Sequence, residues 1–309
     1  MNVKDFAVSV KDLDVKFGDF FAVKKISFDV RPGEIFGFLG ANGAGKTTTI
    51  RVLCGLLAPT NGNVRVAGEN YGGLGAALKM KVGYMSQRFT LYEDLTVLEN
   101  LTLAAELHHM TPKRANERRK ELLDFIGWTR PLNFIVKDLP GGQKQQVSLV
   151  AALMHDPEII FLDEPTAGVS PAARLLFWNL IRKLSAQGKT VFVTTHYMDE
   201  AEYCGRIALM RAGELVALDS PSELKILTFP RGLIELEPKR ALTNFEVTEI
   251  KNSGYFDLFE PYGLRFHAEW KNKEIAKQKS AWLENLMTSK QIPPSLEDVF
   301  IRIVEGRDR

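Results

Sequence analysis

The segment Gly40-Ala41-Asn42-Gly43-Ala44-Gly45-Lys46-Thr47-Thr48 decides the fold. It matches the pattern G-x-x-x-x-G-K-[ST], in which glycines let a tight loop turn its backbone N–H groups onto phosphate oxygens. In such a loop the Lys46 amine reaches the β- and γ-phosphates, and the Thr47 hydroxyl coordinates Mg²⁺. The apolar run Ile35–Leu39 precedes the loop, and a helical pattern follows to about Leu57. This strand-loop-helix context favours a nucleotide site over an accidental glycine-rich turn.

Two acidic residues follow a second apolar run. Residues 159–162 read as a buried strand, and Asp163 and Glu164 come directly after it. Asp163 is expected beside the phosphate loop, where it holds Mg²⁺ directly or through water. Glu164 is expected to accept a proton from the attacking water. Alone, this pattern is more often simply a strand end, but the phosphate loop upstream favours the catalytic interpretation.

A third segment, Leu139-Pro140-Gly141-Gly142-Gln143, opens a helix that runs to about Met154. With the two preceding motifs, it resembles the ATP-binding subunits of ABC transporters, whose signature reads L-S-G-G-Q. The resemblance implies that Pro140, Gly141, Gly142 and Gln143 face the γ-phosphate of an ATP held by a second subunit. The free N–H groups and the dipole at a helix start suit an anion.

Three further positions match the family one by one. Phe17 falls where the family stacks an aromatic ring on adenine, although an ordinary core phenylalanine is the alternative. Gln87 falls at the glutamine that senses Mg²⁺ and water and connects to the membrane subunit. His196 follows the strand pattern at 190–194 and corresponds to the histidine that contacts the γ-phosphate and orients the water. The remaining histidines fit no motif and are expected to be structural or on the surface: His108, His109, His155 and His267.

Two positions depart from the family pattern. Pro140 stands where serine is usual, which removes a hydroxyl and one backbone N–H. Ser170 replaces the usual aspartate of the loop that crosses the dimer interface. One interpretation is subfamily drift with retained activity. The other is an asymmetric pair, in which this subunit completes its partner's site poorly. We favour the first because Gln87, Glu164 and His196 are all present.

Alternating strand and helix patterns predict an α/β fold. We expect a P-loop ATPase core with a parallel sheet, an antiparallel β layer near Phe17, and a helical subdomain at about residues 95–155. Thr96 and Glu99 form a capping-box pattern in that subdomain, and Thr111-Pro112 is a typical helix start. Residues 1–228 are expected to form the ATP-binding domain and 229–309 a small C-terminal α+β accessory domain. The latter resembles the tail of ABC-2-type exporter subunits, ending in Pro294-Ser295-Leu296-Glu297-Asp298-Val299-Phe300, although a generic dimerisation or packing module is the alternative.

Composition narrows the class of protein. The chain has 309 residues, 45% of them apolar, and a net charge of +2, which gives no reason to expect nucleic-acid binding. Its apolar runs are too short to cross a bilayer. Cys54 and Cys204 lie far apart, as buried thiols of a reduced compartment would. The chain is therefore expected in the cytoplasm, on the inner face of the cell membrane, held there by partner subunits.

These patterns predict a subunit that binds and hydrolyses MgATP. Head-to-tail closure with a second ATP-binding subunit, identical or different, would energise an ABC transporter of the ABC-2 export type. The membrane-spanning subunits would contact a groove near Gln87 and the helical subdomain. The apolar residues of Phe89-Thr90-Leu91-Tyr92 are candidates for that contact, although core packing is the alternative. A non-transport ABC ATPase switch is one alternative. An ATP-clamping subunit with weak hydrolysis is the other.

Overall fold

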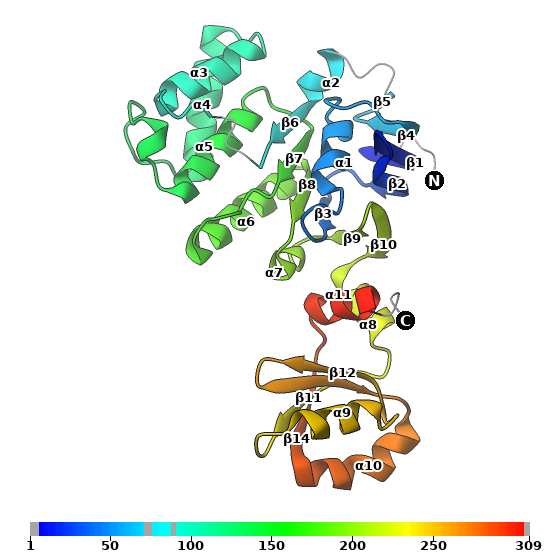
Figure 1. Cartoon of the computed structure of the whole chain (residues 1–309). Helices are drawn as coiled ribbons and strands as arrows, with labels where there is room; N and C mark the ends of the chain where they lie inside the picture. The colour runs from blue at the N-terminus through cyan, green and yellow to red at the C-terminus, as the bar shows by residue number, and fades with distance from the viewer. Residues whose placement is uncertain (1–5, 71–75, 88–90, 306–309) are drawn as a thin grey trace. The chain divides into compact units, whose positions relative to one another are not determined.

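A computed structural model describes residues 6–70, 76–87 and 91–305. The chain divides into two compact units, Met1–Ser220 and Pro221–Arg309 (Figure 1). The expected boundary after residue 228 coincides with the end of helix α8 (Pro221–Thr228), which belongs to the second unit. None of the helices in the described ranges is both long and apolar enough to cross a membrane.

The core of the first unit is a six-stranded sheet of order β10-β9-β3-β8-β7-β6. Neighbouring strands of this sheet pair in parallel, except β10 and β9, which are antiparallel. Every residue of β7 and β8 is buried, as continuous apolar runs in a parallel sheet require. The strands are β3 (Ile35–Leu39), β6 (Val82–Met85), β7 (Ile159–Asp163), β8 (Thr190–Thr195), β9 (Arg206–Arg211) and β10 (Glu214–Asp219).

An antiparallel layer of order β2-β1-β4-β5 packs on this sheet. Its strands are β1 (Val8–Phe17), β2 (Phe20–Val30), β4 (Asn61–Val66) and β5 (Glu69–Asn70). Aromatic rings join the two layers. The ring centroid of Phe28 in β2 lies 5.7 Å from that of Phe36 in β3, and the Phe36 centroid lies 5.4 Å from that of Phe192 in β8. The shared core fixes the β1–β2 hairpin against the strand that leads into the phosphate loop.

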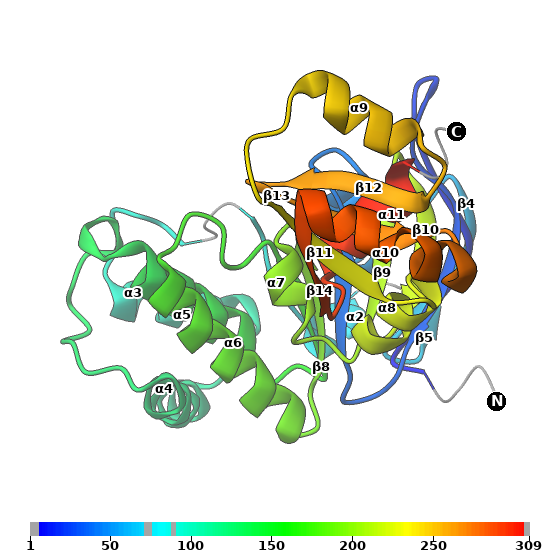
Figure 2. The same ribbon diagram turned by 90° about the horizontal axis from the view of Figure 1, so that it is seen from below.

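The helical subdomain comprises α3 (Val97–Leu107), α4 (Pro112–Ile126) and α5 (Gly141–Leu153), with a short 3-10 turn at Val136–Asp138. Figures 1 and 2 both show these helices gathered beside the core sheet. The capping box of Thr96 and Glu99 is confirmed, and Thr111 caps α4 with Pro112 as its first residue. The other helices of the unit are α1 (Lys46–Leu53), α2 (Ala76–Lys81), α6 (Pro171–Ala186) and α7 (Met198–Ala201).

The second unit is a small α+β fold with an antiparallel sheet of order β12-β13-β11-β14. Ile250 of α9 and Leu283 of α10 pack with Leu236 and Phe259 in its core. Asp298 of α11 is buried and accepts from His267 Nδ1 at 2.6 Å. The elements are β11 (Leu233–Pro238), α9 (Asn244–Asn252), β12 (Phe256–Tyr262), β13 (Arg265–Trp270), α10 (Lys273–Leu286), β14 (Met287–Ile292) and α11 (Leu296–Glu305).

Candidate nucleotide site

The phosphate loop joins β3 to α1 and approaches neighbouring backbone closely. A Cβ on Gly40 would lie 2.3 Å from the Met210 carbonyl oxygen, and one on Gly45 would lie 2.5 Å from the Ala22 carbonyl oxygen. Gly45 also has a φ of 110°, which only glycine adopts readily. Helix α1 has no side-chain cap, so its first N–H groups remain available to an anion. Lys46 Nζ donates to the Gly40 carbonyl at 2.8 Å, within the same loop.

Asp163 lies at the carboxyl end of β7, fully buried. Its Oδ1 accepts from Thr194 Oγ1 at 2.6 Å and from Thr47 Oγ1 at 3.2 Å, whereas its Oδ2 is buried without a hydrogen-bond partner. Burial, the largest effect, raises the pKa of this carboxyl above its ordinary value. An unpartnered carboxylate oxygen beside a threonine hydroxyl fits Mg²⁺, which prefers hard oxygen ligands.

Glu164 is the centre of the candidate catalytic group. Its carboxylate lies 3.3 Å from Lys46 Nζ and 3.2 Å from His196 Nδ1, and it accepts from Gln87 Nε2 at 3.1 Å. The carboxylate is 6% exposed, so these neighbours replace most of its water. The sequence-predicted residues Lys46, Gln87, Glu164 and His196 therefore meet at one point.

Thr194 positions both acids, and sequence reasoning missed it. Its hydroxyl donates to Asp163 and accepts from the Glu164 backbone N–H at 3.0 Å. Thr194 pairs with Asp163 across the parallel β7–β8 ladder, so this relay depends on the register of two strands. The only sequence signal would have been a threonine two residues before His196, which has no meaning until the strands are aligned.

Glu200 is a second positioning residue outside the prediction. It is completely buried and accepts from Thr195 Oγ1 at 2.7 Å and Thr166 Oγ1 at 2.5 Å. Arg174 Nε of α6 lies 3.2 Å from the same carboxylate. Glu200 thus ties the segment around His196 to the segment that follows Glu164. Nothing in the local sequence marks this glutamate.

The signature segment lies on other elements of the same unit. Pro140 precedes α5 and its carbonyl accepts from Gln143 N at 2.9 Å, so Gly141 and Gly142 carry the first helical N–H groups. A Cβ on Gly142 would lie 2.7 Å from Ala173 Cβ, so α5 and α6 pack closely there. In the view of Figure 1, α5 and α1 lie on opposite sides of β6 and β7. A hollow of about 380 Å³ is lined by this segment and by residues 168–170.

Ser170 has a local structural role. Its hydroxyl accepts from Ala173 N at 3.3 Å and caps α6, with Pro171 as the first helical residue. The substitution that departs from the family pattern therefore preserves a good helix start.

Phe17 ends β1 and is 52% exposed, which contradicts the alternative that it is a core residue.

Of the histidines outside the motifs, His155 stacks on His108 with ring centroids 3.6 Å apart, and burial lowers the pKa of His155 to about 4. Leu91 is buried and Tyr92 is exposed, whereas Phe89 and Thr90 lie outside the described residues.

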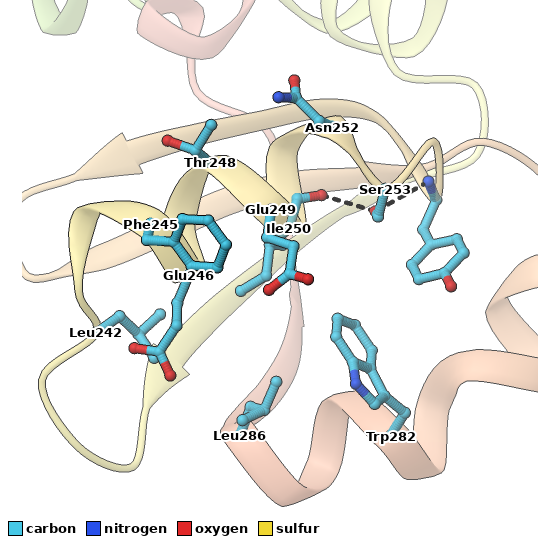
Figure 3. Close-up of a pocket in the computed structure, with 11 residues that line it drawn as sticks. Leu242, Phe245, Glu246, Thr248, Glu249, Ile250, Asn252, Ser253, Trp282 and Leu286 are labelled. Atoms are coloured by element: carbon cyan, nitrogen blue, oxygen red, sulfur yellow. Dashed lines mark hydrogen bonds between the residues drawn. The ribbon is translucent and has the colours of Figure 1, made fainter.

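A hollow of about 700 Å³ lies in the second unit between α9 and α10 (Figure 3). Phe245, Ile250, Trp282 and Leu286 contribute its apolar lining, and Glu249 is among its polar residues. It contains none of the sequence-predicted site residues.

Comparisons with known proteins agree with the motifs. The ABC transporter family model matches residues 23–167. The chain is 38% identical to Nod factor export ATP-binding protein I of Burkholderia lata, over 97% of each chain. It is 44% identical to YbhF, a probable multidrug ABC transporter ATP-binding protein of Escherichia coli, over 71% of this chain and 38% of YbhF. The chain thus spans well under half the length of that relative.

Solved structures match about 70% of the chain. The dimeric ATP-binding cassette MJ0796, in a post-hydrolysis state with ADP and phosphate, superposes with a TM-score of 0.63 at 28% identity. The match covers 69% of this chain and 98% of that one. The protein cbiO1 of Clostridium perfringens, part of the ABC transporter complex cbiONQ, has a TM-score of 0.66 at 25% identity, covering 71% of this chain and 90% of cbiO1. Cassettes of this kind bind and hydrolyse ATP and act in pairs.

Proposed function

Because the chain belongs to the ATP-binding proteins of the ABC transporter family, we propose that it hydrolyses MgATP to drive export through partner subunits in the membrane. The observation that carries this proposal is the buried Glu164 carboxylate, in contact with Lys46, Gln87 and His196. A surface phosphate site would need the loop alone, whereas hydrolysis also needs a base beside the γ-phosphate.

The chain's residues divide the chemistry among them. Lys46 exchanges its carbonyl partners Gly40 and Ala41 for β- and γ-phosphate oxygens. Thr47, Asp163 and Gln87 would hold Mg²⁺, which neutralises developing charge on those oxygens. Glu164 takes the proton of the attacking water, and His196 orients that water.

The second ATP-binding subunit completes the site. The N–H groups of Gly141 and Gly142, in the first turn of α5, would bind the γ-phosphate of an ATP held by the partner. Two chains therefore close head-to-tail over two nucleotides, each holding one with Phe17 and the loop at residues 40–48. Closure brings the amides into place only when ATP is bound, which couples binding to movement.

Partner subunits in the membrane contact the groove between the core sheet and the helical subdomain. This groove, about 690 Å³, is lined by residues that include Tyr84, Leu91, Tyr92 and Leu107. Leu107 is 71% exposed and Tyr92 is 59% exposed, and because both line one groove they form apolar surface that a partner can cover. The groove lies close in sequence to Gln87, so partner contact and the catalytic group are linked. The chain is thereby held on the inner face of the cell membrane.

The extent of one sequence match supports the ABC-2 export type. The match to Nod factor export ATP-binding protein I covers 97% of the chain, so it includes most of residues 229–309, which we assign as the accessory domain. The names of the relatives describe export of a Nod factor in one case and multidrug transport in another, which supports export as the direction of transport.

A tagged pull-down from detergent-solubilised native membranes tests this function. The account expects a polytopic membrane protein to co-purify with the wild-type chain. Leu107→Glu should lose it, because a charge in the groove opposes apolar contact. Leu264→Glu is the matched control, since Leu264 is 95% exposed, belongs to the second unit and is not among the residues that line the groove. Recovery of ribosomal or repair factors alone would instead support the non-transport ATPase switch.

A further inference from the structure

The tip of the β1–β2 hairpin carries two aromatic rings on one face. A two-residue turn, Gly18-Asp19, joins Phe17 to Phe20, and the two phenylalanines are register partners across the strands. Side chains of cross-strand partners lie on the same face, with Cβ atoms about 5 Å apart. Phe17 is 52% exposed and Phe20 is 66% exposed, so neither ring is covered by the core.

The opposite face of the hairpin carries a different pair. Phe21 is the partner of Lys16, whose Nζ lies 5.2 Å from the Phe21 ring centroid. Phe21 is thus already covered by a cation on its own face. It offers a matched comparison for Phe20, since the two are adjacent, aromatic, exposed and on opposite faces.

The strand that carries Phe20 is fixed against the phosphate loop. Ala22, two residues along β2, lies at the register shift between the β1 and β2 strands and is buried. Its carbonyl oxygen makes the close approach to Gly45 described above. Gly213 bridges the same two segments, since it accepts from Lys24 N at 2.7 Å and donates to the Ala44 carbonyl at 3.0 Å. The hairpin tip that holds Phe17 and Phe20 is therefore two residues from backbone that packs on the loop that binds the phosphates.

We propose that Phe20 is a second base-contacting residue, which forms with Phe17 a two-ring platform for the nucleobase of ATP. This inference rests on the proposed nucleotide site and names a residue that the motifs do not. A purine bound on this face removes apolar surface of both rings from water, which explains two large exposed phenylalanines at one turn. Neither ring has a hydrogen-bonding atom, so the platform holds the base by its face and edge without reading its polar groups.

Equilibrium binding of two ligands to the 309-residue chain tests the platform. Isothermal titration calorimetry gives the Kd of ATP and of inorganic tripolyphosphate, which has no base. For Phe20→Ala we expect the Kd of ATP to rise about fivefold to tenfold, as for loss of a base–aromatic contact. The Kd of tripolyphosphate should not change, because the phosphate loop is untouched. Phe17→Ala should behave similarly, and Phe21→Ala should bind both ligands as wild type does.

Three outcomes would contradict the inference or its premise. If Phe20→Ala binds ATP as wild type does while Phe17→Ala is weakened, Phe20 is not part of the platform and the nucleotide site stands. If Phe20→Ala weakens ATP and tripolyphosphate equally, or if Phe21→Ala weakens ATP as much, the effect is on the hairpin and not on the base. If Lys46→Ala binds ATP as wild type does, the proposed function itself fails.

Discussion

Glu164 has a backbone φ of 49°, a conformation that residues other than glycine rarely adopt. The strain is held by the Glu164 N–H, which donates to the Thr194 hydroxyl, and by the contacts of its carboxylate. Glu164→Gln keeps the shape of the side chain but cannot accept a proton. We expect ATP hydrolysis to fall by about 100-fold to 10,000-fold, the usual contribution of a general base, with ATP still bound. Phosphate release and ATP binding measured on the same protein check this.

The matched control for Glu164→Gln is Glu158→Gln. Glu158 is an exposed glutamate that comes directly before Ile159, the first residue of β7. The turnover of Glu158→Gln should equal that of wild type. Unchanged turnover in Glu164→Gln would remove Glu164 from the catalytic role and leave hydrolysis without a base.

Asp163 makes folding stability depend on pH. Below its ordinary pKa of 3.8 the carboxyl is protonated in both the folded and the unfolded chain. As pH rises, the unfolded chain loses the proton first, because burial raises the pKa in the folded chain. Stability therefore falls with rising pH until the folded carboxyl also ionises. Asp163→Asn lacks this penalty, so its Tm advantage over wild type should grow with pH above about 4 in buffer without nucleotide or Mg²⁺.

Calorimetry at pH values from 4 to 8 measures the Tm difference between Asp163→Asn and wild type. This interval begins near the ordinary pKa of a carboxyl and extends past that of histidine. Asp19→Asn, at an exposed turn residue, serves as the control. A Tm difference for Asp163→Asn that is the same at every pH would mean that its carboxyl does not hold its proton on burial.

Single residues differ in how far the sequence could predict them. Lys46, Asp163 and Glu164 sit in motifs whose spacing is local. They meet because both motifs come at the carboxyl ends of strands of one parallel sheet, β3 and β7. Thr194 and Glu200 act through hydrogen bonds that arise only when β8 and α7 are placed beside β7, and no local pattern encodes them. Their roles depend on tertiary structure.

At the scale of elements, helix starts were predictable because caps are local. The capping box of Thr96 and Glu99 and the Thr111-Pro112 start both appear as expected. The strand order was not predictable in the same way. β3 lies between β8 and β9, which follow it by more than 150 residues along the chain, and their pairing depends on packing against the helices.

The start of α5 decides between full and weak hydrolysis. Pro140→Ser restores a hydroxyl and an N–H to the signature segment. Because Gly141 and Gly142 already carry free N–H groups, we expect the dimer's turnover to change by less than about tenfold. Turnover of Pro140→Ser beside wild type, at saturating MgATP, makes the comparison. A gain of about 100-fold or more, the usual cost of one missing oxyanion donor, would favour the ATP-clamping subunit.

At the scale of the whole molecule, the relatives differ in how much of the chain they cover. Solved cassettes cover about 70% of the chain, whereas the Nod factor export relative covers both units. The first unit carries the loop, the acids and the signature segment. Its signature segment opens α5, which Figure 1 shows on the other side of β6 and β7 from α1, so under the proposed function a complete site needs two chains. Dimerisation in response to ATP is therefore the central claim.

Sedimentation velocity of the Glu164→Gln chain, with and without MgATP, tests that claim most directly. Slow hydrolysis should trap the closed pair, so the account predicts a dimer with MgATP and a monomer without it. Lys46→Ala combined with Glu164→Gln should remain a monomer in both conditions, because the nucleotide that joins the two faces is not held. A Glu164→Gln chain that binds ATP and yet stays monomeric at every protein concentration would contradict the account.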